Sequence, residues 1–238
     1  MRKFFLIVLF VSVQVIFFAQ NSKKKNKASN GKTDEFNLTN YKGEPGDRLI
    51  IELNHTSWLG KPSEIKTNWR SLGFNFAFMF DKPIGNSSFS FGYGLGIYNH
   101  NYHSNADFSY VNDSISHSQF TKLRPLKSDY KTNSYSEKII EIPLELRYRS
   151  KTDRKFKVAL GIKGGYVVNN FRKLENNDEK IKVYNTKNIN RLRYGVNFRI
   201  GVEQFCFTAC YYVSEVFTKD KGVNGVNMFS IGFALIPY

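Results

Sequence analysis

The sequence predicts an all-β fold: a transmembrane, antiparallel, up-and-down β-barrel of about eight strands. Three observations predict it. The first residues have the pattern of an export signal, no later segment has the long uncharged stretch of a membrane helix, and apolar and polar residues alternate in segments of bilayer length. Because the mean hydropathy is only -0.41, an exported chain of this kind is either soluble or crosses a membrane as strands.

The N-terminus is expected to be a secretory signal peptide over residues 1–19. Arg2 and Lys3 precede an apolar run, and Ala19 supplies the small residue before a cleavage point. The apolar run is shorter than the roughly twenty residues that a spanning helix needs. Residues 20–47 are rich in Lys, Asn, Ser and Gly without periodicity, which predicts a flexible periplasmic leader. Residues 48–238 are then left for the barrel.

The alternation is clearest in two segments, KIIEIPLELRYRS at 138–150 and RLRYGVNFRIGVE at 191–203, each with one apolar and one polar or small face. The same criterion predicts strands over 48–57, 70–80, 89–100, 138–149, 155–169, 191–203, 205–214 and 228–236. The connections between these segments alternate between short and long. Periplasmic turns and extracellular loops of outer-membrane barrels alternate in the same way.

A soluble barrel with an apolar interior is the rival interpretation, and volume decides between the two. About forty large apolar residues lie on the apolar faces, whereas the interior of an eight-stranded barrel is only just wide enough to be filled by side chains. Glycines lie on the opposite face, where a narrow lumen needs small residues. The apolar face is therefore predicted to point outward, into lipid.

Aromatic residues near the predicted strand ends are expected to form girdles at the two bilayer interfaces. The residues assigned to these girdles are Trp58, Trp69, Phe80, Phe89 and Tyr148.

Charged residues of the inward parity are expected to form a structural ion-pair network, because a buried charge without a partner is costly. The network is predicted to contain Glu52, Glu141, Glu145, Arg147, Lys163, Arg199 and Glu203, with Lys157 and Arg193 on the same face. These charges would plug a narrow lumen. The alternative is that they line a narrow conducting path.

Nothing in the sequence points to catalysis, a metal or another cofactor. The four histidines do not have metal-ligand spacing, and no G-x-S-x-G segment is present. His100 and His103 start the longest connection, where a lipid-modifying barrel enzyme could use a histidine, so that activity is kept as an alternative. Cys206 and Cys210 lie four residues apart on one strand, too far to pair, and are expected to be free thiols.

The expected binding partners follow from the export of the chain and from its net positive charge. A net charge of +15 would suit nucleic acid inside a cell, but an exported chain is expected to meet outer-membrane lipids and lipopolysaccharide phosphates instead. The connection over 101–137 is long and carries aromatic residues, so it is a candidate surface for a protein partner. The barrel is expected to be a monomer that meets the barrel-assembly machinery during biogenesis.

Several segments resemble the PorT-like outer-membrane β-barrels of Gram-negative bacteria. They are EIPLELRYR at 141–149, GYGLGIYNH at 92–100, GIKGGY at 161–166 and the terminal FSIGFALIPY. The resemblance covers residues 48–238 and implies eight strands with both termini in the periplasm. Some members of that family serve protein secretion and gliding. The end of the chain departs from the usual pattern, because Tyr238 follows Pro237 and falls on the lumen parity.

The function expected from these observations is that of a small outer-membrane β-barrel with a plugged polar lumen and long extracellular loops, in a binding or structural role. Three alternatives stay open: an accessory component of a secretion system, a narrow channel, and a lipid-modifying enzyme.

Overall fold

The computed structural model describes residues 49–112, 119–151 and 156–237. The predicted signal peptide (1–19), the predicted leader (20–47) and the terminal Tyr238 lie outside the described residues. Within those residues, no helix is long and apolar enough to cross a membrane.

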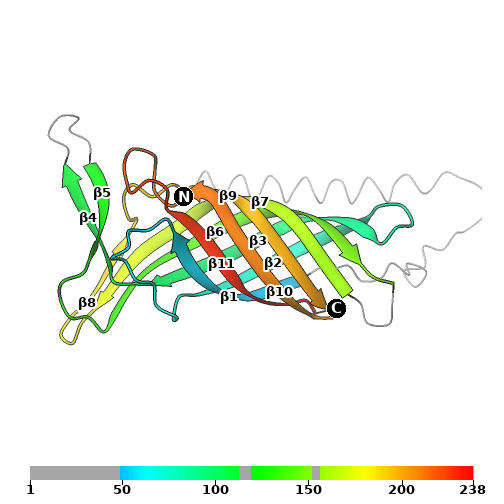
Figure 1. Cartoon of the computed structure of the whole chain (residues 1–238), viewed down its shortest axis with the longest axis horizontal. Helices are drawn as coiled ribbons and strands as arrows, with labels where there is room; N and C mark the ends of the chain where they lie inside the picture. The colour runs from blue at the N-terminus through cyan, green and yellow to red at the C-terminus, as the bar shows by residue number, and fades with distance from the viewer. Residues whose placement is uncertain (1–48, 113–118, 152–155, 238) are drawn as a thin grey trace, which may run out of the picture. The chain divides into compact units, whose positions relative to one another are not determined.

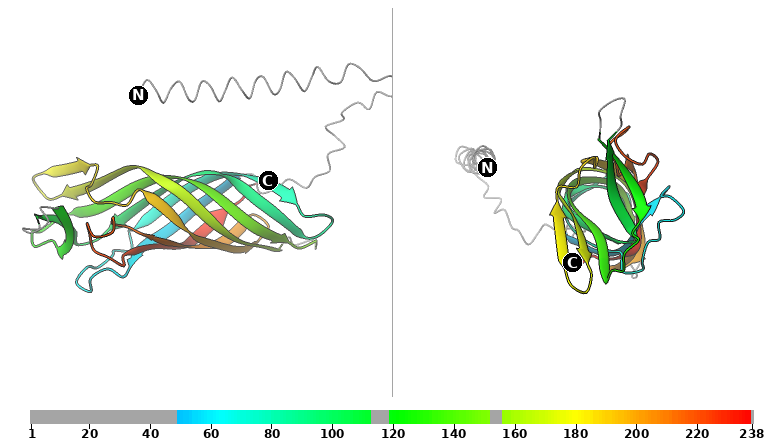
Figure 2. Two further views of the ribbon diagram at one scale, coloured as in Figure 1. Left: turned by 90° about the horizontal axis from the view of Figure 1, so that it is seen from above. Right: turned by 90° about the vertical axis from the view of Figure 1, so that its left-hand side faces the viewer.

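Antiparallel strands account for most of the described chain, and eight of them close into a ring (Figures 1 and 2). These strands are β1 (Leu49–Leu59), β2 (Leu72–Pro83), β3 (Phe89–His103), β6 (Thr132–Arg149), β7 (Phe156–Glu175), β9 (Leu192–Val202), β10 (Phe205–Glu215) and β11 (Asn227–Leu235). Each pairs with its neighbour along the chain, and the first pairs with the last, from Ile51 opposite Leu235 to Leu59 opposite Asn227. The predicted fold class, an up-and-down antiparallel barrel, is confirmed.

The connections fall into two groups at opposite ends of the ring. We call the end with residues 84–88, 150–155 and 203–204 the short-turn end. The other end, with residues 60–71, 104–131, 176–191 and 216–226, is the long-loop end, and it holds β4, β5 and β8 on the left of Figure 1. This is the alternation that the spacing of the strands predicts.

The two faces of the ring differ as the alternation requires. On β6, Glu141 and Glu145 are buried while Ile140, Ile142 and Leu146 between and beside them are exposed. The same holds around the ring, where most of the exposed large apolar side chains belong to outward positions of the strands. Exposure of so much apolar surface is expected of a sheet that faces lipid rather than water.

Glycine makes room for the large polar side chains inside. A Cβ on Gly92 would come within 2.6 Å of the Arg147 guanidinium, and one on Gly161 within 2.8 Å of the Glu145 side chain. Both distances are shorter than any van der Waals contact allows. The glycines of the inward parity therefore hold space for the charged residues opposite them.

Three strands were not predicted, and all lie at the long-loop end. They are β4 (Ala106–Asn112) and β5 (Gln119–Pro125), which pair with each other, and β8 (Lys180–Tyr184), which pairs with the last residues of β7. In addition, β6 begins six residues before the predicted start at 138, and β7 runs six residues past the predicted end at 169. These extensions carry polar residues on both faces, so the rule of one apolar face does not detect them.

Candidate functional site

The inward side chains of the eight strands meet along the axis of the barrel, and buried ion pairs occupy it at three levels. The strands fix this arrangement, because every second residue of a strand points to the same face. The acidic residues come mainly from β6, where Glu137, Glu141 and Glu145 follow one another at intervals of four. The cationic partners come from β7, β9 and β6 itself.

Glu145 forms the level nearest the short-turn end. Its carboxylate lies 2.8 Å from the Arg147 Nη2 and 2.5 Å from the Arg199 Nη2, and it accepts a further hydrogen bond of 2.8 Å from the Asn197 amide. Glu145, Arg147 and Arg199 are each at most 5% exposed. Asp81 extends the cluster, with its carboxylate 3.5 Å from the Arg147 Nη1. Little empty space is left here, since the cavity beside these residues measures about 10 Å³, room for about one water.

Glu141 forms the middle level. One carboxylate oxygen lies 3.0 Å from the Lys163 Nζ, and the other accepts a hydrogen bond of 2.7 Å from the Tyr212 hydroxyl. The Lys163 ammonium also lies 4.1 Å from the ring centroid of Tyr98 and 4.5 Å from that of Tyr212, within range of cation–π attraction. This buried cation is thus held by one carboxylate and two aromatic rings.

Glu137 forms the level nearest the long-loop end. It pairs with Arg193 at 2.9 Å, and both side chains are completely buried. Arg193 also donates to the backbone carbonyls of Asn190 and Glu215, which ties the loops at this end to the pair. The Tyr135 hydroxyl donates to the same carboxylate at 3.1 Å.

Two residues of the predicted network behave differently. Glu52 is inward and half-buried and lies within electrostatic range of Lys163, but its side-chain hydrogen bonds in the described structure are to the neutral Asn54, Asn75 and Thr208. The placement of Glu203 in the lumen is wrong. β9 ends at Val202, and Glu203 lies exposed in the two-residue turn to β10 with a φ of 54°. A residue in a left-handed turn leaves the alternation of the strand, so its parity says nothing about its face.

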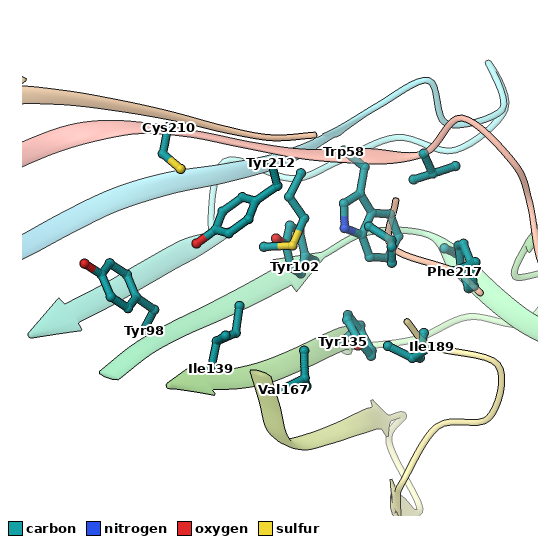
Figure 3. Packing of buried hydrophobic residues seen from close by; sticks show 14 of the residues in the cluster. Trp58, Tyr98, Tyr102, Tyr135, Ile139, Val167, Ile189, Cys210, Tyr212 and Phe217 are labelled. Carbon is teal, nitrogen blue, oxygen red and sulfur yellow. The ribbon is translucent and has the colours of Figure 1, made fainter. Parts of the chain in front are cut away.

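An aromatic cluster of Trp58, Tyr102, Phe108, Tyr135 and Phe217, which we call the aromatic cap, lies beyond Glu137 toward the long-loop end. Figure 3 shows Trp58, Tyr102, Tyr135 and Phe217 within the buried cluster. Trp58 stacks on Tyr102 with ring centroids 4.8 Å apart, and it contacts Phe108 and Tyr135 at 6.1 and 5.9 Å. Phe217 adds a contact to Phe108 at 6.0 Å. The cap joins inward residues of β1, β3 and β6 to residues of β4 and the β10–β11 loop.

The cap overturns the assignment of Trp58 to an interfacial girdle. Trp58 is 1% exposed and shares the inward parity of Asn54 and Thr56, so it points into the barrel and not toward lipid. The placement near a strand end suggested a girdle. The parity of β1 is the property that sets the direction of the side chain.

The other four predicted girdle residues are on the outside. Phe80 and Phe89 are exposed at the short-turn end, where Phe80 stacks on Tyr93 and Phe89 packs against the half-buried Tyr148. Trp69 is 75% exposed in the β1–β2 loop. Three of the five residues therefore gather at one end of the barrel, and Trp69 lies at the other.

Sequence reasoning missed several members of the lumen clusters. Glu137 shares the parity of Glu141 and Glu145, but it precedes the predicted start of its strand by one residue. Asp81 lies one residue beyond the predicted end of the second strand. Extending each alternation past the apolar part of its strand would have found both. The sequence also predicts Lys157 and Arg193 on the inward face, and both are buried there.

Other candidate chemistry is limited in the described part of the chain. His100 is buried in the lumen with its Nε2 3.4 Å from the Tyr212 hydroxyl, whereas His103 is partly exposed at the end of β3. Cys206 and Cys210 are buried on the inward face of β10, and neither forms a disulfide within the described residues. No cluster of three or more metal-ligating side chains occurs among the residues described.

These features place the chain among barrels that expose an apolar band outward and bury charge inward, which is the organisation of proteins that span the outer membrane with strands. Residues 18–214 match the family described as the outer membrane protein beta-barrel domain, and the chain belongs to this family. No curated protein matches the chain, and no solved structure does.

Proposed function

We propose that the protein is a closed, non-conducting outer-membrane barrel, exported by a signal peptide, that acts as a monomer in a binding or structural role. In this proposal the long-loop end faces the cell exterior. The observation that carries the proposal is the aromatic cap. Its buried rings lie directly above the completely buried ion pair of Glu137 and Arg193.

The energetics of the lumen support closure. Glu141 and Glu145 each accept from at least two donors, so a passing ion would have to replace contacts that are shorter than 3.1 Å. Separating buried charges leaves each one desolvated without its partner, at a cost of about 3–5 kcal/mol per pair. An ion would have to cross three such levels one after another along the axis.

Single-channel recording in planar bilayers tests closure. The folded protein is expected to give no discrete conductance steps, and its folding is checked by the gel migration of the same sample, which differs with and without boiling. Steps of uniform size in samples that contain only folded protein would overturn the closed barrel and favour the narrow channel.

We also propose that the barrel is not an enzyme. The histidine with the best-defined polar partner, His100, lies inside the barrel against Tyr212, where the headgroup of a lipid cannot reach it. Mass analysis of lipid extracts tests this proposal. Outer membranes with and without the protein should contain glycolipids and phospholipids of identical mass, and a mass change that depends on the protein would contradict it.

The resemblance of EIPLELRYR to PorT-like barrels favours a second role, as an accessory component of a secretion system. The loops at the long-loop end are folded into β4 and β5, which contribute Phe108 and Leu123 to the buried cluster, and into β8, which extends from β7, so they offer a partner a defined surface. Deletion of the gene should then abolish export of a cargo protein while the outer membrane stays intact. Unchanged export in the deletion strain would remove this role.

A further inference from the structure

A pocket of about 380 Å³ lies at the long-loop end, apart from the lumen charges. Three segments form it: the loop over 66–70, the turn after β3 over 103–105, and the start of β6 over 130–133. Backbone hydrogen bonds join the first two, from Asn68 to His103 at 2.7 Å and from Asn105 to Lys66 at 3.3 Å. A third backbone hydrogen bond, from Ser104 to Asn133 at 3.2 Å, joins the turn after β3 to the start of β6, so all three walls are fixed to one another.

The pocket is cationic. Lys66, Arg70 and Lys131 line it, and none of its lining residues is acidic. Arg70 and Lys173 both lie close enough to His103, another lining residue, to act on its imidazole electrostatically. The carboxylate of Glu175, which follows on the same strand, is engaged by Lys173 at 2.6 Å and is also within electrostatic range of Lys131, so it offsets part of the positive charge of four nearby cations. The charge that the pocket offers to a ligand is thus positive.

One lining residue of the pocket, Thr67, has a buried side-chain hydroxyl without a hydrogen-bond partner among the described residues. A buried polar atom of this kind costs free energy unless a ligand or a water satisfies it. The three cations that line the pocket suit an anion that carries several acceptor oxygens, such as a phosphate ester.

The position of the pocket points to a lipid as the source of that phosphate. The outward-facing apolar residues of β2 begin at Leu72, which is 43% exposed and only two residues after Arg70. Trp69 precedes Arg70 in the same loop and is 75% exposed. The Arg70 guanidinium lies 5.7 Å from the centroid of the Trp69 ring. Exposed Trp beside Arg or Lys is typical of the level of lipid headgroups.

We propose that this pocket binds the phosphorylated sugar headgroup of an anionic glycolipid in the leaflet at the long-loop end. The volume is sufficient for a phosphate with its sugar, since ligand pockets begin at about 300 Å³. Lys66, Arg70 and Lys131 pair with the phosphate oxygens, and the acyl chains lie against the outward apolar face of β2. The inference deepens the proposed binding role and rests on it.

Native mass spectrometry of the full mature protein, released from neutral micelles, tests the site. The probe is a glycolipid with two phosphates on an acylated glucosamine disaccharide, and its dephosphorylated form is the ligand control. Loss of one cation near a headgroup should weaken binding about fivefold, so Lys66→Ala/Lys131→Ala should weaken it by about 25-fold. The matched variant Lys219→Ala/Lys221→Ala removes two exposed lysines from the β10–β11 loop, outside the pocket, and should bind as the wild type does.

Each result decides the question. Equal retention of the phosphorylated and dephosphorylated glycolipids, or equal losses in the two double variants, would overturn the site. If glucosamine 1-phosphate bound with the same dependence on Lys66 and Lys131 while the glycolipid did not bind, the lipid assignment would be wrong. A boiling-dependent gel shift for every variant shows that it is folded. Conductance recorded on the same samples separates this inference from the closed barrel, because either can fail while the other holds.

Discussion

Replacement of Glu145 by Ala is the most direct test of how the lumen is stabilised. Glu145 is 3% exposed and its two oxygens accept from Arg147, Arg199 and Asn197. Removal of the carboxylate takes a counter-charge from two buried guanidinium groups at once, and Asp81 remains near only one of them, at 3.5 Å from Arg147. We expect the free energy of unfolding to fall by about 3–5 kcal/mol.

The assay is equilibrium unfolding in urea with the protein folded in phosphatidylcholine vesicles, followed by tryptophan fluorescence. Trp58 is buried in the aromatic cap, so its transfer to water on unfolding changes the emission. Glu203→Ala is the matched control, because Glu203 is exposed in a turn and its loss should change stability by less than about 0.5 kcal/mol. If Glu145→Ala were as stable as Glu203→Ala with an unchanged slope in urea, the ion pairs would not hold the lumen together.

Three further predictions concern the faces, the topology and the cap. Leu144→Arg places a charge on the outward face of β6 and should cost about 2–4 kcal/mol near the midplane, measured by the same unfolding assay; no loss would invert the assignment of faces. A cysteine at the exposed Asn177 should react with a membrane-impermeant thiol reagent on intact cells and one at the exposed Asn86 should not, whereas the opposite labelling would mean that the barrel runs the other way. Trp58→Ala should cost about 3–5 kcal/mol and speed proteolysis of the 104–131 loop, since the cap packs the loop onto the barrel; an unchanged cleavage rate would contradict this role.

The fold could be predicted from the sequence because alternation over bilayer-length segments is a local property. Eight predicted segments correspond to the eight strands of the ring, and Glu141, Glu145 and Arg199 lie on the face that their parity assigns. The outward direction of the apolar face also followed from the sequence, through the volume of the side chains alone.

The pairing within the lumen could not be predicted in the same way. Parity gives the face of a residue, but the partner of an inward charge depends on strand register and on which strands are neighbours. Arg199 reaches Glu145 although 54 residues separate them, because β9 and β6 both flank β7. Glu52 has the same parity as the residues of these clusters and yet has neutral partners.

The sequence by itself thus determined the class of fold, the number of strands in the ring and the faces of the strands, because these depend on periodicity and on the length of each segment. Only the tertiary structure decided what fills the long-loop end. Trp58, Tyr102 and Phe217 are far apart in the chain, and their meeting with Phe108 depends on how β4 and the loops fold back over the ring. The cationic pocket arises for the same reason, since Arg70 and Lys131 become neighbours only when three separate segments close around it.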